Sequence, residues 1–100
     1  MNSILNLLTI CRKAGKLSMG FDSAAEAVVK RKARLIVLAS DLSPKTEKEI
    51  RFTAGKASVP VIKTEMSIDE INFGLGKKVG VLAVCDEGFS ERLSQLVCGR

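Results

Sequence analysis

The chain has 100 residues, 46% of them hydrophobic and 27% charged, which is typical of one water-soluble domain with an ordinary core. No apolar run approaches the roughly 20 residues needed to cross a bilayer. Residues 1–10 lack a leading positive charge and a small-residue cleavage site, so we expect no signal peptide. The chain contains no histidine, which removes the commonest general base and the commonest metal ligand.

The formal net charge of +5 belongs to one end of the chain. Up to Arg34, seven basic residues stand against two acidic ones, and from Leu35 onward nine basic and nine acidic residues cancel. Such a distribution favours a one-sided surface for a polyanion, with RNA the leading candidate. Cys11, Cys85 and Cys98 are odd in number and widely spaced, so we interpret them as reduced thiols of a cytoplasmic protein. Of the three, Cys98 is the one expected to be exposed.

The first third of the chain predicts two helices joined by a short extended segment. Apolar residues at helical spacing predict a helix over residues 4–14, capped by Ser3 and ended by Gly15 in a left-handed conformation. Residues 16–19 are expected to be extended. Gly20 then permits a turn, and Asp22 or Ser23 is expected to cap a second helix that ends in the basic residues 30–32.

The remaining elements alternate between strands and helices. Residues 35–39 form a continuous apolar run, as expected of a strand covered on both faces. Ser43 is expected to cap a helix that reaches about residue 57, with Pro44 at its first position. A strand over residues 59–63 follows, and the capping box from Ser67 to Glu70 opens a short helix to about residue 73. A glycine-rich loop over residues 74–80, a strand over 81–85 and a closing helix over 87–97 complete the chain.

This order predicts an α/β fold, a three-layer α/β/α sandwich around a small mixed sheet of about four strands, mostly parallel. We expect residues 1–100 to form a single domain. Ligand sites in such folds collect where strands end and helices begin. The Gly20 turn, the loop with Ser40 and Asp41, and the loop over residues 74–80 are therefore expected to share one edge of the sheet.

Five segments form an ordered set of motifs along the chain. They are Leu7-Leu8-x-x-Cys11-Arg12-Lys13-Ala14-Gly15-Lys16-Leu17-Ser18-Met19-Gly20, Ala33-Arg34-Leu35-Ile36-Val37-Leu38-Ala39-Ser40-Asp41-Leu42-Ser43-Pro44-Lys45-Thr46, Val59-Pro60-Val61, Gly76-Lys77 and Val84-Cys85-Asp86-Glu87-Gly88-Phe89. This ordered set resembles the kink-turn-binding ribosomal proteins, the large-subunit "seven-Ae/thirty-e" superfamily, and in particular its short bacterial branch. The resemblance covers nearly the whole chain, and no single piece of it is specific.

The resemblance implies a protein that binds sharply bent RNA at tandem sheared G·A pairs, through a helix that begins at the glycine matched by Gly20. The family pattern there is Gly-x-Asn-Glu-x-x-Lys, whereas this chain has Asp22, Ser23 and Glu26 at the last three defined positions. Ser40 stands before Asp41 where the family often has Glu. Ionised Asp only accepts hydrogen bonds, whereas Asn also donates, and Glu26 would repel a phosphate that Lys would bind. These departures leave open whether the target is a standard kink-turn.

The sequence therefore predicts a non-enzymatic, cytoplasmic, monomeric protein that binds structured RNA, expected to be ribosomal RNA, with ribosomal or other ribonucleoprotein components as further partners. No membrane, cofactor, metal or catalytic residue is expected. By analogy with the family's loop, Val79 is expected to offer an apolar contact to an extruded base. The candidate RNA-binding residues are Lys16, Gly20, Asp22, Ser23, Glu26, Lys30, Lys32, Ser40, Asp41, Lys77, Lys78 and Val79.

Each of these signals also has a purely structural interpretation. Basic residues at 30–34 suit the negative end of a helix dipole, Gly20 is a turn former, and Asp22 and Ser23 are ordinary caps. The Gly74-x-Gly76 segment follows a helix and lacks a Gly-Lys-Ser/Thr ending, which argues against a nucleotide loop. Two other functions remain open. An exposed apolar patch on the same edge would favour a protein-interaction module, and a deep pocket with several perturbed acids would favour an enzyme.

Overall fold

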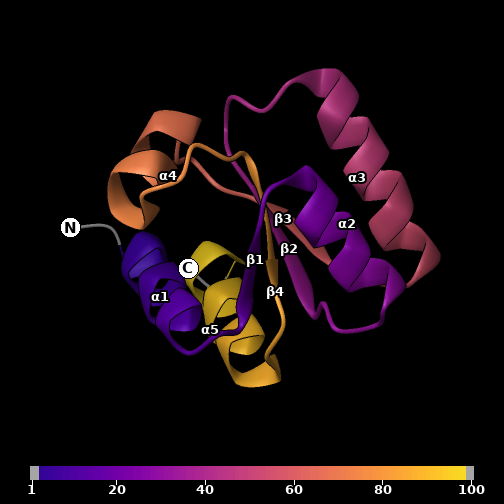
Figure 1. Ribbon diagram of the computed structural model, residues 1–100, viewed down its shortest axis with the longest axis horizontal. Coiled ribbons are helices and arrows are strands. Elements are labelled where there is room, and N and C mark those ends of the chain that lie inside the picture. Colours follow the sequence, from indigo (N-terminus) through magenta and orange to yellow (C-terminus); the bar gives the residue numbers. More distant parts are fainter. Residues whose placement is uncertain (1–2, 99–100) are drawn as a thin grey trace.

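The computed structural model describes residues 3–98, and the side chains of residues 3–97. Helices and strands alternate along this part of the chain (Figure 1). In order they are α1 (Ser3–Lys13), β1 (Leu17–Met19), α2 (Phe21–Val29), β2 (Leu35–Leu38), α3 (Pro44–Lys56), β3 (Val61–Lys63), α4 (Ile68–Leu75), β4 (Val81–Val84) and α5 (Glu87–Cys98). No helix in this part of the chain is both long and apolar enough to traverse a bilayer.

The four strands form one mixed sheet in the order β1-β4-β2-β3. Only β2 and β3 pair in parallel, because β4 is antiparallel to both β1 and β2. The prediction of a mostly parallel sheet was therefore only partly right, because one of the three strand pairs is parallel, and the mixed sheet of four strands is confirmed. The register places Leu35 opposite Val84 and Leu38 opposite Val81.

The connections between the strands show how this pairing arises. A parallel connection needs a crossover that carries the chain back to the starting end of the sheet. Helices α2 and α3 make this return before β2 and β3, whereas the segment that contains α4 leaves β4 to start at the end of the sheet where β3 ends. A strand that is buried on both faces has the same continuous apolar sequence whether it pairs in parallel or antiparallel. The sequence therefore gave no signal for the direction of β4.

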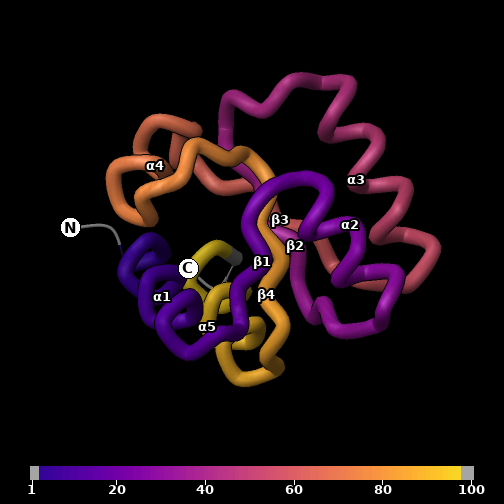
Figure 2. The backbone as a smooth tube through the Cα atoms, viewed as in Figure 1, coloured from indigo at the N-terminus to yellow at the C-terminus, as the bar shows by residue number. Residues whose placement is uncertain are grey.

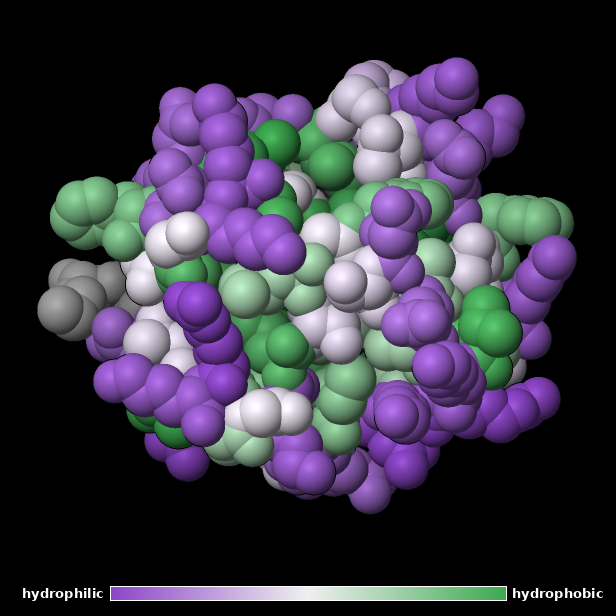
Figure 3. All heavy atoms as spheres, viewed as in Figure 1, coloured by the Kyte–Doolittle hydropathy of each residue, from purple (hydrophilic) through white to green (hydrophobic). Residues whose placement is uncertain are grey.

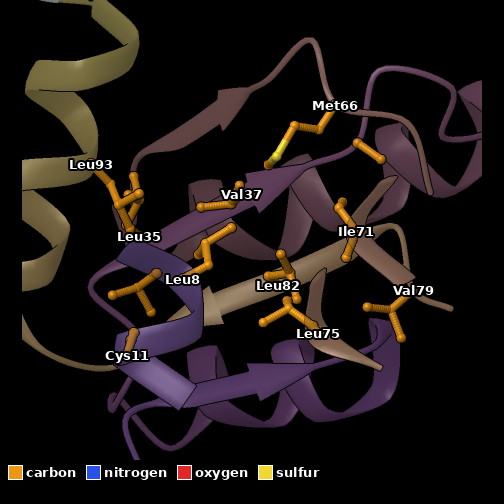
Figure 4. Packing of buried hydrophobic residues seen from close by; sticks show 12 residues of the cluster. Leu8, Cys11, Leu35, Val37, Met66, Ile71, Leu75, Val79, Leu82 and Leu93 are labelled. Carbon is orange, nitrogen blue, oxygen red and sulfur yellow. The ribbon is translucent and has the colours of Figure 1, made fainter. Parts of the chain in front are cut away.

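Strand residues alternate between two apolar clusters, one on each face of the sheet. Leu35 and Val37 pack with α1, α4 and α5, and Figure 4 shows this cluster around Leu8 and Leu82. Ile36 and Leu38 pack on the other face, against α2 and α3. Figure 1 shows the same division, with α2 and α3 on one side of the sheet and α1, α4 and α5 on the other. The predicted three-layer sandwich is confirmed.

Most of the predicted helix ends are confirmed. Ser43 accepts a hydrogen bond from the Thr46 N–H at 3.2 Å with Pro44 at the first helical position, and Ser67 and Glu70 form the complete capping box. Gly15 ends α1 with φ +74°. Thus the capping residues of the sequence define these helices as expected.

Three helix ends differ from the sequence expectation. Ser3 is the first residue of α1 itself, and α2 begins at Phe21 with Gly20 as its N-cap, so neither Asp22 nor Ser23 caps it. Helix α4 continues to Leu75, so Gly74 lies within the helix rather than at its end. Gly74 faces Leu5 of α1, and an added Cβ would lie only 2.5 Å from Leu5 Cδ2. Gly74 thus permits α4 to pack against α1 rather than ending the helix.

Candidate nucleic-acid interface

Three loops meet at one edge of the sheet, as predicted. The Gly20 N–H donates to the Val81 carbonyl at 2.8 Å, and the Ala39 N–H donates to the Gly80 carbonyl at 2.9 Å. The segment before β4 therefore runs beside the turn between β1 and α2, as Figure 2 shows. We call this edge the strand-end surface, defined by the predicted site residues Gly20, Asp22, Ser23, Ser40, Asp41, Lys77, Lys78 and Val79.

Gly20 has a backbone conformation that is nearly exclusive to glycine. Its φ of +101° and ψ of 157° lie in a region that costs other residues free energy. An added Cβ would sit 3.8 Å from Val79 Cγ1, an ordinary contact distance. The requirement for glycine at this position is therefore conformational rather than a matter of space.

The start of α2 presents backbone N–H groups on the strand-end surface. The first intrahelical bond runs from the Ala24 N–H to the Gly20 carbonyl at 2.9 Å, and no side chain of residue 20 caps the helix. The N–H groups in the first turn of a helix lack intrahelical acceptors and favour anions. Asp22 and Ser23 are exposed beside them, so a carboxylate and a hydroxyl flank these donors.

Asp41 has a structural task on this surface. Its Oδ1 accepts the Ile68 N–H at 2.9 Å, at the first residue of α4, and the neighbouring Ser40 N–H donates to the Met66 carbonyl at 2.7 Å. These bonds connect the end of β2 to the start of α4. Asp41 was a candidate RNA contact on the sequence, and these hydrogen bonds give it a structural role.

The loop before β4 supplies two lysines and a largely buried valine. Lys78 Nζ lies 3.7 Å from Asp69 Oδ1, but the two side chains are 71% and 84% exposed, so the pair is weak and easily exchanged. Lys77 is exposed. Val79 is only 9% exposed and lies at one end of the first apolar cluster (Figure 4). The Val79 side chain thus lies next to Gly20 and exposes little apolar surface that an extruded base could contact.

Four predicted residues do not join this surface. Glu26 lies a turn further along α2, and its carboxylate pairs with Lys30 Nζ at 3.5 Å. Lys16 precedes β1 and Lys32 precedes β2, so both lie at the opposite end of the sheet. At the usual rise per strand residue, Lys16 and Gly20 are about 13 Å apart. Lys16, which the sequence grouped with Gly20 in one RNA-binding surface, therefore lies at the other end of the sheet from Gly20.

The opposite end of the sheet contains a hollow that sequence analysis did not identify. Its volume is about 540 Å³, and Arg31 and Arg34 line it together with Lys16 and Lys32. We call it the basic hollow; its lining residues are Gly15, Lys16, Leu17, Ser18, Arg31, Lys32, Arg34 and Cys85. Basic residues placed before two neighbouring strands were the signal that could have predicted it.

The surface offers little support for a protein-interaction patch on the same edge. The large apolar side chains that are exposed among the described residues lie one on each helix. Figure 3 shows the face over β1 as a narrow strip, neutral to moderately hydrophobic, between hydrophilic side chains over α2 and α4. Scattered single apolar residues are normal on a protein surface. The exposed residues are Ile10, Val29, Phe52, Phe73 and Leu96.

The titratable groups do not form a catalytic arrangement in the part of the chain that the structure describes. A hollow of 350 Å³ beside β3 is lined by one carboxylate, Glu65. Glu47, whose pKa is lowered by hydrogen bonds from Lys63 and Arg51, lies on α3 and is not part of the lining of that hollow. Burial raises the pKa of the Cys11 thiol to about 11, with contributions from Cys85 and Asp86, so this thiol stays protonated at neutral pH. Cys98 lies outside the described side chains.

Residues 2–94 match the family described as the ribosomal protein L7Ae/L30e/S12e/Gadd45 family. The chain is 28% identical to the RNA-binding protein YlxQ of Enterococcus faecium, over 95% of this chain and 91% of that protein. It is 33% identical to the large ribosomal subunit protein eL30 of Aeropyrum pernix, over 83% of this chain and 85% of that protein.

Two solved structures share the fold. A protein of unknown function from Bacillus halodurans superposes with a TM-score of 0.90 at 28% identity, covering 97% of this chain and 98% of that one. The Giardia lamblia 15.5kD RNA binding protein superposes with a TM-score of 0.76 at 18% identity, covering 93% and 80% of the two chains. On the strength of the family match, which spans nearly all of its residues, the chain belongs to the ribosomal protein L7Ae/L30e/S12e/Gadd45 family.

Proposed function

We propose that this protein is a non-enzymatic, monomeric RNA-binding protein that recognises structured, kink-turn-like RNA through the strand-end surface. The observation that carries the proposal is the pair of backbone hydrogen bonds, Gly20 to Val81 and Ala39 to Gly80, which bring three loops to one edge beside a helix start. Relatives named as an RNA-binding protein and as large ribosomal subunit proteins support the ligand class. Its proposed setting is the cytoplasm, with ribosomal RNA as the target and ribosomal or other ribonucleoprotein components as neighbours.

Each part of the surface has a distinct role in this proposal. The N–H groups at the start of α2 donate to phosphates or base edges, and Gly20 has no side chain to block the approach. Asp22 accepts from base amino groups, and Ser23 both donates and accepts. Lys77 and Lys78 hold phosphates. Asp41 acts indirectly by fixing the loop at the end of β2.

Two lysine substitutions test the location of the site. In Lys77→Gln/Lys78→Gln, the slope of log affinity against log salt for a kink-turn RNA should fall by about 0.7–0.9 for each lost phosphate contact. The control is Lys45→Gln/Lys48→Gln, which removes two exposed lysines from α3. Equal losses in the two double variants would refute the assignment of the strand-end surface and leave only the net charge as the source of affinity.

A further inference from the structure

The basic hollow is a concentrated positive surface with no acid in its lining. Lys16, Arg31, Lys32 and Arg34 are all exposed around a volume of 540 Å³, and the other lining residues are uncharged. Among the described side chains, none of these four cations forms an ion pair. Unpaired cations crowded together repel one another, and an anionic ligand relieves that repulsion.

The nearby acids have other partners. Glu26 pairs with Lys30 at 3.5 Å, on the outer face of α2. Asp86 follows Cys85 directly, but its Oδ2 accepts the Phe89 N–H at 3.0 Å and so caps the start of α5. Neither carboxylate forms an ion pair with a cation of the basic hollow among the described side chains.

Backbone hydrogen bonds hold the cation-bearing segments in place. The Lys16 carbonyl accepts the Cys85 N–H at 2.8 Å, and the Arg34 N–H donates to the Val84 carbonyl at 2.7 Å. Both segments are thus fastened to the end of β4, the second strand from one side of the sheet. Cations on a fixed backbone lose less conformational entropy when they bind a ligand.

Arg31 occupies a position where glycine would be more stable. It follows the C-terminal cap of α2 with φ +60°, and the turn is closed by the Lys32 N–H, which donates to the Ala27 carbonyl at 2.8 Å. Glycine is the usual residue at this left-handed position because a Cβ is disfavoured there. Ser58 has the same conformation after α3, with φ +57°, so strain alone does not identify a site. Ser58 therefore provides a matched control for the strain at Arg31.

We infer that the basic hollow is a second RNA-contact surface, which binds backbone phosphates of a segment other than the one held by the strand-end surface. The inference rests on the proposed function, because it takes RNA as the ligand. Four exposed cations spread over 540 Å³ suit several successive phosphates rather than one small anion. Contacts of this kind give affinity and position without reading sequence.

A straight RNA duplex tests this surface separately from kink-turn recognition. Titration of the ¹⁵N-labelled protein with the duplex at low salt should shift the amide signals of Lys16, Arg34 and Cys85 more than those of Gly20 and Ser23. In Lys16→Gln/Arg34→Gln, the salt slope for the duplex should fall by about 0.7–0.9 for each lost contact. Among the described residues, neither side chain makes a hydrogen bond or ion pair that supports the fold, so the thermal midpoint should not fall.

Arg31→Gly separates binding from stability. The substitution should raise the thermal midpoint by several degrees while it lowers affinity for the duplex. Ser58→Gly should raise the midpoint similarly and leave affinity unchanged. An Arg31→Gly protein that binds the duplex like the wild type would overturn the inference.

The remaining outcomes separate the two surfaces. Absence of duplex binding, or shifts confined to Gly20 and Ser23, would also overturn the inference and leave the strand-end proposal standing. Shifts at Lys16 and Arg34, combined with indifference to sheared G·A pairs in a kink-turn RNA, would support the basic hollow and reject the proposed function.

Discussion

The Gly20 N–H donates to the carbonyl of Val81 across 2.8 Å, and this bond connects the N-cap of α2 to the first residue of β4. Val81 follows directly after the loop that carries Lys77 and Lys78. The position of these lysines relative to the start of α2 is therefore set by backbone pairing. In the proposed complex, one RNA segment can contact both elements without any rearrangement of the protein.

Gly20→Ala should destabilise the protein even without RNA. At φ +101° and ψ 157°, a side chain is expected to cost about 1–3 kcal/mol. Urea denaturation of the RNA-free protein measures this loss. Gly55→Ala is the matched control, because Gly55 lies inside α3 with open space around an added Cβ, and it should stabilise by about 0.5–1 kcal/mol. If both substitutions changed the free energy of unfolding in the same direction, the conformational argument would be contradicted.

Asp22→Asn and Glu26→Lys should each raise affinity for a kink-turn RNA. Asn removes a negative charge near phosphates and adds a donor. Lys at position 26, one turn outside the strand-end surface, replaces a carboxylate that repels RNA phosphates at longer range with a group that attracts them. An effect of about 1 kcal/mol, roughly fivefold in the dissociation constant, is expected for each. Glu49→Gln on the exposed face of α3 is the control for net charge, and an equal gain there would remove α2 from the interface.

Asp41→Ala should cost stability and affinity together, whereas Asp41→Asn should keep both. The Asp41 Oδ1 accepts the Ile68 N–H at 2.9 Å, and an amide oxygen can accept the same bond. Loss of this cap-like bond is expected to cost about 1 kcal/mol in thermal or urea denaturation. Weak RNA binding by a fully stable Asp41→Asn protein would instead indicate direct contact of the carboxylate with RNA.

Glu47→Gln should destabilise slightly at neutral pH and not in acid. Hydrogen bonds from Lys63 and Arg51, both at 2.9 Å, lower the Glu47 pKa below its usual 4.5. The folded state binds this proton less readily than the unfolded state, so the stabilisation is present above pH 4.5 and disappears as pH falls through the lowered pKa. Thermal midpoints of the two proteins should converge in acid. The thermal midpoint of Lys63→Gln should converge with that of the wild type in the same way. A difference in thermal midpoint that stayed constant across pH would contradict the interaction between ionised Glu47 and Lys63.

The predictions from sequence succeeded where local chemistry determines structure. The capping box at Ser67, the Ser43 cap with Pro44, and the two-sided burial of residues 35–38 all depend on neighbours in the chain. The common edge of Gly20, Ser40 and the loop before β4 followed from the alternation of elements. These features needed no information about which strands pair.

The errors arose where structure depends on non-local pairing. The place of β4 between β1 and β2 is not encoded in any local pattern, and it reversed the expected strand direction. The lysines at 16 and 32 were assigned to one surface with Gly20 because charge was counted along the chain rather than across the sheet. Arg31 and Arg34 were missed for the same reason, and their shared hollow with Lys16 became apparent only from the fold.

The most direct test of the central proposal is a titration of the protein against a kink-turn RNA, a variant with its sheared G·A pairs replaced, and a straight duplex, each at two salt concentrations. The account predicts tight binding to the kink-turn RNA that is lost when those pairs are replaced. Equal, salt-sensitive binding to all three RNAs, or no binding at low salt, would contradict it.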